Sequence, residues 1–260
     1  MPPDREVRYA PVVSRAEIPA PHLERPPDEP EPRRGMRGAL VAAAAVGCAA
    51  VLALSAARLT AELTRDPTPA ELAAARTAEV ANRYRTWPAG RIFPASLRYT
   101  LQGSAGTARR LGVDTGTACP SGVDTALADT LASLGCRAVL RATYLDGQRA
   151  LAITVGVVVL PDAGSAARAA KSFKVKRGVR ALAFPGSYAA RFDDAARQTA
   201  AVRTGGPYVV AATLGYADGR RRGRNPQPDL PPLAAQLAAG VLAPLAAPAA
   251  VDCAAREWSC

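Results

Sequence analysis

The sequence predicts an α+β protein in which a single transmembrane helix is followed by an extracytoplasmic antiparallel sheet with helices packed on one side. Three observations support this fold class. An uncharged run covers residues 38–57, two later stretches have the residue pattern of β-hairpins, and helical patterns separate those stretches. Helices interleaved with hairpins are typical of a mostly antiparallel sheet.

The uncharged run is long enough to cross a membrane once. It lies between Arg37 and Arg58, and a helix of that length spans roughly 30 Å, the thickness of a bilayer core. We therefore predict a transmembrane signal-anchor helix over 37–58. Half of the run is alanine, and small residues near its end resemble a cleavage site, so a buried soluble helix and a cleaved signal peptide are the alternatives.

The segment before the run, 1–36, is predicted to be a disordered cytoplasmic tail. It holds nine prolines, its charges nearly cancel, and it has too little apolar surface to offset the entropy of ordering. Four arginines precede the run within twenty residues and three follow it within twenty, which weakly favours a cytoplasmic N-terminus.

The cysteines support the same orientation. Apart from Cys48 inside the run, all of them follow it, as expected for disulfides in an oxidising compartment. We predict that Cys119 pairs with Cys136 and Cys253 with Cys260, because sequence neighbours close a bridge with little rearrangement. The other two pairings stay open, and free thiols in a cytosolic domain are the alternative.

A stalk helix is predicted over 59–87. Thr68, Pro69 and Glu71 have the spacing of an N-cap, a first-turn proline and a capping box. Four apolar residues then share one face at helical spacing: Leu72, Val80, Tyr84 and Trp87. We expect this face to pack on the domain, and a dimer seam is the alternative.

The extracytoplasmic α+β domain is predicted over 88–247, and a cysteine-containing tail over 248–260. The domain begins with a strand within 91–101, followed by a glycine-rich loop over 102–118 and a helix that Ser121 caps.

The clearest pattern in the chain is a hairpin over 137–160 around the turn pair Asp146 and Gly147. Its first arm alternates polar and apolar residues and is predicted to be half exposed, whereas the second, 149–160, is apolar on both faces and is predicted to be central. The following elements are a helix over 163–173, a helix over 188–197 capped by Ser187, a hairpin around 205–207, a loop over 218–229 and a helix over 230–245.

The composition resembles that of a known group of proteins. The chain has 30 arginines against 3 lysines and is rich in alanine, as expected from a GC-rich genome. In composition and layout it resembles the uncharacterised single-pass membrane proteins of actinobacteria. The resemblance implies a location in the cell envelope and assigns no functional residue.

The chemistry-bearing residues argue against an enzyme. The only histidine is His22, in the tail, so the domain lacks the usual general base and the commonest zinc ligand. No phosphate-binding loop or dinucleotide fingerprint is present, and after the uncharged run glutamate occurs only in the stalk and the last residues. We therefore predict no catalytic residue, no metal site and no cofactor.

One short string has an enzymatic counterpart. Asp114, Thr115 and Gly116 match the Asp-Thr-Gly turn of aspartic proteases, in which two such aspartates share a proton. The chain has a single copy, without the hydrophobic strand that leads into the motif in that family. A dimeric aspartic-protease-like enzyme is therefore only a remote alternative, and we interpret the string as a polar turn.

The charge points to a binding function. Because charges in the tail nearly cancel, the net charge of +11 belongs to the portion that follows it. The excess is gathered in two clusters: Lys171, Lys174, Lys176, Arg177 and Arg180, and then Arg220, Arg221, Arg222 and Arg224. Exposed basic clusters attract polyanions. Few aromatic residues accompany them, so nucleic acid is not the expected partner.

These observations predict a non-catalytic module of the cell envelope, tethered to the cell membrane, that binds or senses an anionic lipid or a cell-wall polymer. The alternative is a structural subunit of an envelope protein complex that contacts a protein partner through the stalk and the span.

Overall fold

The computed structural model describes residues 34–114, 116–223 and 227–250. It divides the chain into two compact units, Met1–Arg65 and Asp66–Cys260. The predicted tail over 1–36 and the predicted bridge between Cys253 and Cys260 fall largely or wholly outside the described residues.

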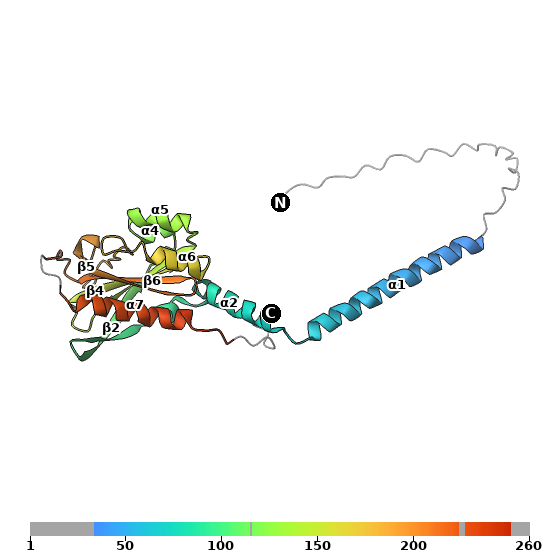
Figure 1. The fold of residues 1–260 in the computed structure, drawn as a ribbon, viewed down its shortest axis with the longest axis horizontal. Coiled ribbons are helices and arrows are strands. Elements are labelled where there is room, and N and C mark those ends of the chain that lie inside the picture. Colours follow the sequence, from blue (N-terminus) through green and yellow to red (C-terminus); the bar gives the residue numbers. More distant parts are fainter. Residues whose placement is uncertain (1–33, 115, 224–226, 251–260) are drawn as a thin grey trace, which may run out of the picture. The chain divides into compact units, whose positions relative to one another are not determined.

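The first unit holds one long helix, α1 (Arg34–Thr64) (Figure 1). Its stretch Gly38–Thr64 is long and apolar enough to cross a membrane, and none of it is buried within the protein. The helix continues for six residues past the predicted end of the span at Arg58. The predicted stalk over 59–87 is therefore divided between two helices.

The second unit begins with α2 (Pro69–Thr86), which starts as the sequence predicts. The Thr68 hydroxyl accepts a hydrogen bond from the Glu71 amide, and the Glu71 carboxylate accepts one from the Thr68 amide, a reciprocal capping box. The side chains of Val80 and Tyr84 pack against the main core of this unit. The apolar face of α2 is thus used within the chain.

Arg83 fastens α2 to the last helix, α7 (Leu230–Ala246). Its guanidinium pairs with Glu79 at 2.6 Å and donates to backbone carbonyls at the C-terminal end of α7. Only 5% of the Arg83 side chain is exposed. One arginine thereby satisfies carbonyls that the helix end leaves without partners.

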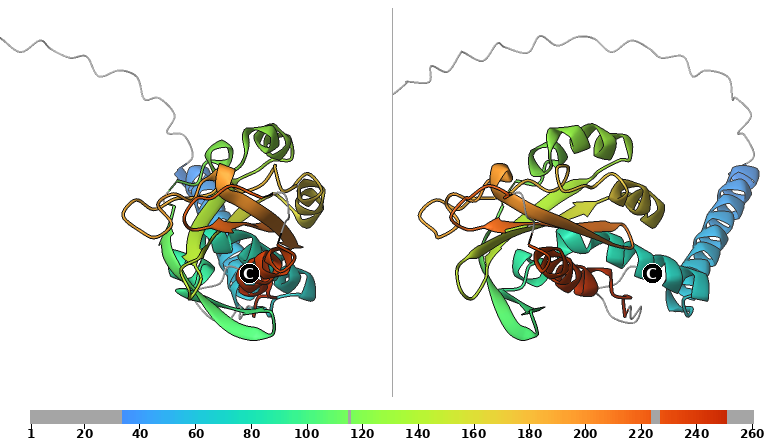
Figure 2. Two further views of the ribbon diagram at one scale, coloured as in Figure 1. Left: turned by 90° about the vertical axis from the view of Figure 1, so that its left-hand side faces the viewer. Right: turned by 60° about the vertical axis from the view of Figure 1, so that its left-hand side comes forward.

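Six antiparallel strands form one sheet in the order β1-β2-β3-β4-β6-β5. The sheet is curled (Figure 2). The strands are β1 (Ser96–Leu101), β2 (Ser104–Val113), β3 (Ala138–Leu145), β4 (Leu151–Val159), β5 (Arg197–Gly205) and β6 (Tyr208–Tyr216). Both predicted hairpins are present, as β3–β4 and β5–β6. The apolar β4 is central, as predicted, and all of its residues are buried.

Helices cover both faces of the sheet, so the prediction of helices on one side was wrong (Figure 2). α2, α3 (Ala89–Ile92) and α7 pack on one face. α4 (Cys119–Gly122), α5 (Thr125–Ser133) and α6 (Ala163–Ala170) contribute to the core on the other face. The physical reason lies in β4 and β6, whose two faces are both apolar and require cover on each side.

The region 102–118, predicted to be a loop, contains the strand β2. Gln102 and Gly103 both have positive φ and form the two-residue turn that joins β1 to β2. A register shift near Gly112 brings the strand against the ring of Phe184, which a Cβ at Gly112 would overlap. Glycine and arginine in this strand concealed its pattern.

The first hairpin arm, predicted to be half exposed, is almost wholly buried. The segment 178–182 crosses its polar face and accepts hydrogen bonds there: Thr143 donates to the Leu182 carbonyl and Arg141 to the Arg180 carbonyl. Gly156 on β4 lets Val179 approach closely, because a Cβ at Gly156 would overlap the Val179 side chain. The polar residues of β3 therefore bind irregular backbone instead of water.

The helix predicted over 188–197 was wrong. That range contains turns and a single 3-10 turn, η1 (Asp194–Ala196), and Arg197 already belongs to β5. Ser187 bonds to the Phe184 carbonyl and the Ala189 amide in a local turn instead of capping a helix. Local polar bonding at Ser187 and Asp193 replaces helical bonding here.

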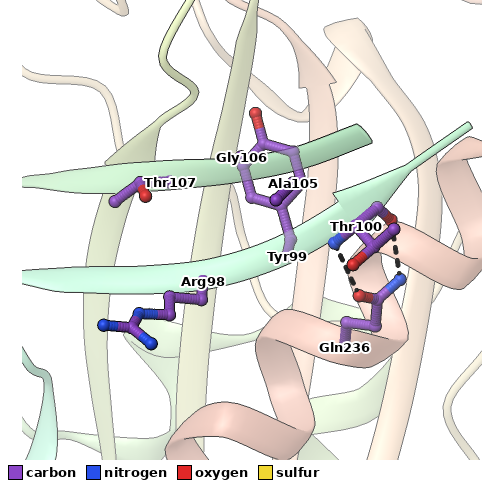
Figure 3. A pocket seen from close by; sticks show the side chains of 7 residues that line it. All are labelled: Arg98, Tyr99, Thr100, Ala105, Gly106, Thr107 and Gln236. Atoms are coloured by element: carbon purple, nitrogen blue, oxygen red, sulfur yellow. Dashed lines mark hydrogen bonds between the residues drawn. The ribbon is translucent and has the colours of Figure 1, made fainter. Parts of the chain in front are cut away.

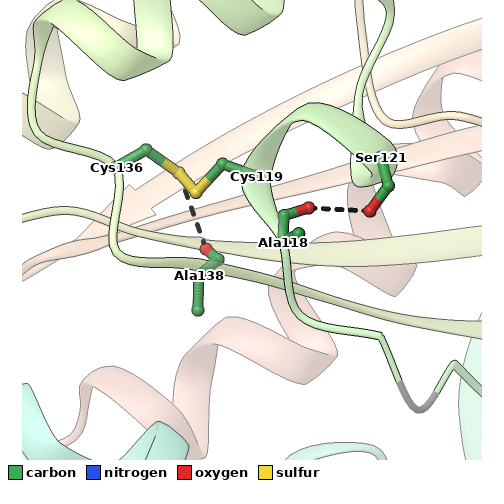
Figure 4. The surroundings of a disulfide bond; sticks show 5 residues. All are labelled: Ala118, Cys119, Ser121, Cys136 and Ala138. Atoms are coloured by element: carbon green, nitrogen blue, oxygen red, sulfur yellow. Dashed lines mark hydrogen bonds between the residues drawn. A yellow bond between two sulfur atoms is a disulfide. The ribbon is translucent and has the colours of Figure 1, made fainter.

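The predicted disulfide between Cys119 and Cys136 is confirmed (Figure 4). It ties α4 to the short connection between α5 and β3, and both half-cystines pack against the core on that face. Ser121, the predicted cap, lies inside α4 and donates to the Ala118 carbonyl. α5 starts after Asp124, whose carboxylate is used elsewhere.

Candidate functional site

The first basic cluster is displayed by a tight turn after α6. Lys174 and Arg177 exchange two backbone hydrogen bonds, of 2.7 and 2.9 Å, so the four residues 174–177 reverse the chain. The side chains of Lys171, Lys174, Lys176 and Arg177 are exposed, and none of them forms an ion pair with a described residue. Arg180 differs, because it pairs with Asp194 at 3.3 Å.

The second basic cluster follows β6. Arg220 stacks on the ring of Tyr216 at 3.8 Å, pairs with Asp218 at 3.2 Å, and its carbonyl accepts a hydrogen bond from Gln198. These contacts fix the loop beside the start of β5. Arg221 and Arg222 are exposed, whereas Arg224 lies outside the described residues.

The fold brings these two clusters to one place. Lys176 from the first and Arg222 from the second line the same cleft, of about 300 Å³, beside the start of β5. The other lining residues are Asp124, Val175, Asp194, Ala195 and Arg197. A cleft edged by two cations from distant parts of the chain is the strongest candidate for an anion-binding surface in the described residues.

The wall of this cleft contains a buried arginine, Arg197, whose side chain is 5% exposed. It pairs with Asp124 at 2.6 Å and with Asp194 at 2.7 Å, and it donates to the carbonyls of Val175 and Val179. Burial acts to lower the pKa of Arg197, but the two carboxylates outweigh it and raise the pKa. Arg197 is therefore charged and neutralised within the fold.

The carboxylates and the exposed cations of the cleft therefore have different roles. Asp124 and Asp194 are occupied by Arg197, and the Asp124 carboxylate also accepts from the Gly178 amide at 2.6 Å. Lys176 and Arg222 keep their charge for a ligand at the rim. This network could not be predicted from the sequence, because Arg197 and its partners carry no local motif.

Asp114, the residue of the protease-like string, is engaged in an ion pair. Its carboxylate pairs with Arg141 at 2.5 Å and accepts a hydrogen bond from the Gly116 amide at 3.0 Å. Burial acts to raise the pKa of Asp114, but the bonds from Gly116 and Arg141 outweigh it and hold the pKa below its usual value. A carboxylate held in this way is suited to fastening β2 to β3.

Other cavities have different linings. One of about 950 Å³ follows α2 and the end of α7, beside Arg83 and Trp87. A second, of about 490 Å³, is shallow and lies over β1 and β2, where the Tyr99 ring covers Gly106 (Figure 3). Among the described residues no group of three or more His, Cys, Asp or Glu side chains is placed to hold a metal ion.

No protein-family model matches the chain, and neither a curated protein nor a solved structure gives a significant match.

Proposed function

We propose that this chain is a non-catalytic binding or sensing module of the cell envelope, tethered by α1, whose basic surface engages an anionic lipid or wall polymer. The observation that carries the proposal is the shared cleft of Lys176 and Arg222, with further exposed cations on the 174–177 turn and at Arg221 that form no ion pair with a described residue. Each cation near an anionic surface contributes about 1 kcal/mol, so several together give binding that salt weakens.

The proposal places the N-terminus in the cytoplasm and the domain outside. It is supported by the apolar helix α1 and by the disulfide between Cys119 and Cys136, a bond typical of oxidising compartments. A reporter that is active only in the cytoplasm, fused after Cys260, should be silent. An active reporter would show that the domain lies in the cytoplasm, where neither the cell wall nor the outer leaflet could be its ligand.

The alternative, a structural subunit of an envelope complex, has less support. Of the four residues in its expected contact on the stalk, all but Leu72 pack against the core of the chain: Val80, Tyr84 and Trp87. The protease alternative requires an aspartate that shares a proton, whereas Asp114 is paired with Arg141.

The test compares two variants of the full chain that lose the same charge. Lys176→Ser with Arg222→Ser removes two cations at the cleft, and Arg98→Ser with Arg109→Ser removes two exposed cations from β1 and β2. Each protein, held in phosphatidylcholine nanodiscs, is pelleted with sucrose-loaded phosphatidylglycerol vesicles or with purified cell wall, at low and at physiological salt.

We expect the cleft variant to bind about 30-fold more weakly at low salt, from about 1 kcal/mol per lost cation. The β1–β2 variant should bind nearly as well as the unchanged chain. Preference for vesicles or for wall identifies the source of the anion. Equal loss in both variants would show that only net charge matters, and equal retention would refute the site.

A further inference from the structure

The two edges of the sheet differ in how their outward backbone groups are covered. β1 and β5 are the outer strands, and an outer strand exposes backbone N–H and C=O groups that can pair with another chain. Natural proteins usually cover or interrupt such an edge.

The β1 edge is covered by a side chain. The Gln236 amide, from α7, accepts from the Thr100 N–H at 2.9 Å and donates to the Thr100 carbonyl at 3.0 Å (Figure 3). It therefore imitates a neighbouring strand near the C-terminal end of β1 and blocks pairing there.

The β5 edge lacks such a cover among the described residues. Gly205 and Tyr208 close a two-residue turn and therefore form a hydrogen-bonded pair. Every second residue of β5 before Gly205 also bonds to β6, and the residues between them direct their backbone groups outward. These outward residues are Ala200, Val202 and Thr204. Among described residues, only the Arg203 side chain bonds to these outward groups, at the Val202 carbonyl.

A groove of about 250 Å³ accompanies this edge. Ala200 and Val202 line it from β5, and Phe173, Val175 and Val179 line it from the segment after α6. Its wall is mostly apolar. A strand added to β5 would direct every second side chain toward this groove.

The surroundings of the groove are positively charged. Lys174 lines the groove and Arg203 extends from β5, and neither forms an ion pair with a described residue. Because Val202 packs on the α6 side of the sheet, Arg203 faces the opposite side by strand alternation. An added strand would thus meet an apolar groove on one face and a cation on the other.

We propose that the β5 edge binds an extended segment of a partner protein by strand addition, with apolar side chains in the groove and acidic side chains opposite Arg203 and near Lys174. This goes beyond the polyanion surface of the previous section, whose centre is the cleft of Lys176 and Arg222. The two sites share Lys174 and Val175 in the segment after α6, but different residues define them: Lys176 and Arg222 for the polyanion, and Arg203 with the outward groups of β5 for the added strand.

The experiment uses the full chain in phosphatidylcholine nanodiscs and a pool of seven-residue peptides in which Asp or Glu alternates with Val, Leu, Ile or Phe. A second pool carries Lys in place of the acidic residues. Backbone amide exchange is measured with and without each pool at millimolar concentration. We expect the acidic pool to slow exchange at Ala200, Val202 and Thr204, and the lysine pool to leave it unchanged.

Two variants test the edge itself. Thr204→Pro removes an outward N–H without touching the bonds to β6, and Lys174→Glu with Arg203→Glu reverses the charge. Both should weaken binding at least tenfold. The matched control, Arg98→Pro, removes an outward N–H from the β1 edge and should leave binding unchanged.

The outcomes separate this proposal from the previous one. Peptide binding should survive Lys176→Ser with Arg222→Ser, and vesicle or wall binding should survive Thr204→Pro. If Thr204→Pro fails to fold, as shown by circular dichroism, the charge variant and the exchange pattern decide. No protection at β5 by the acidic pool, equal protection by the lysine pool, or protection confined to β1 would overturn the inference.

Discussion

The junction between α2 and α7 should depend on Arg83 more than on any of its exposed neighbours. Arg83→Ala leaves the Glu79 carboxylate, which is 14% exposed, without its cation, and it removes a donor from the carbonyls of Pro244, Leu245 and Ala247. Loss of one partner from a buried ion pair costs about 3–5 kcal/mol, and a hydrogen bond to a charged group contributes about 1.5–3 kcal/mol.

These contributions are not additive, so we expect a total loss of about 4 kcal/mol in the free energy of unfolding. Arg83→Lys keeps the charge but not the planar fork, and it should lose about half as much. The matched control is Arg85→Ala, two residues away on the exposed side of α2, which should change stability by less than about 0.5 kcal/mol.

The assay is pulse proteolysis of the full chain in nonionic detergent across a urea series, which reports unfolding of the domain and is insensitive to the detergent-bound α1. Adding Glu79→Ala to Arg83→Ala should restore part of the loss, because no unpaired carboxylate is left at the junction. A loss for Arg83→Ala within 1 kcal/mol of the Arg85→Ala control would refute the reasoning.

Three further predictions use the same assay. Cys119→Ser should cost about 3 kcal/mol by releasing a bridge of sequence separation 17, and a loss below 1 kcal/mol would contradict it. Asp114→Asn should cost about 2 kcal/mol at pH 7, because it breaks the ion pair with Arg141. Since the pKa of Asp114 is lowered in the folded protein, the stability difference between the two proteins should be full above about pH 4. It should vanish as the pH falls through the folded pKa of Asp114. Burial raises the pKa of Tyr208 to about 12, so the unfolded chain loses this proton first and stability should fall between pH 10 and 12. Tyr208→Phe loses the bond to the Val80 carbonyl, should cost about 1 kcal/mol at pH 7, and should show a smaller alkaline fall; an unchanged alkaline profile would exclude Tyr208 as its source.

Features that depend on neighbouring residues could be read from the sequence. The start of α2 follows from Thr68 and Glu71, three residues apart, whose mutual bonds need nothing from the rest of the chain. The central position of β4 follows from its continuous apolar run, and the bridge of Cys119 to Cys136 follows from their separation in the chain. The exposure of Lys174 and Arg177 also follows from local composition, whereas the turn that they close was not predicted.

Features that depend on long-range contacts could not be read from the sequence. Arg141 and Thr143 alternate with apolar residues as in a half-exposed strand, but the segment 178–182 crosses that face and buries them. The second layer of helices covers the other apolar face of β4 and β6, and no periodicity in β3 reveals it. The pairing of distant segments is decided only when the chain closes on itself.

The candidate site also combines properties that the sequence determines with properties that only the fold decides. The sequence by itself determined that Lys176 and Arg222 are solvated cations, because local charge density keeps both in water. The tertiary structure decided that they edge one cleft, and that Arg197 belongs to its wall. A register shift between Arg197 and Thr199 places Arg197 opposite Gly215, on the face of Asp124; without the extra residue, simple alternation would place Arg197 on the face of α7.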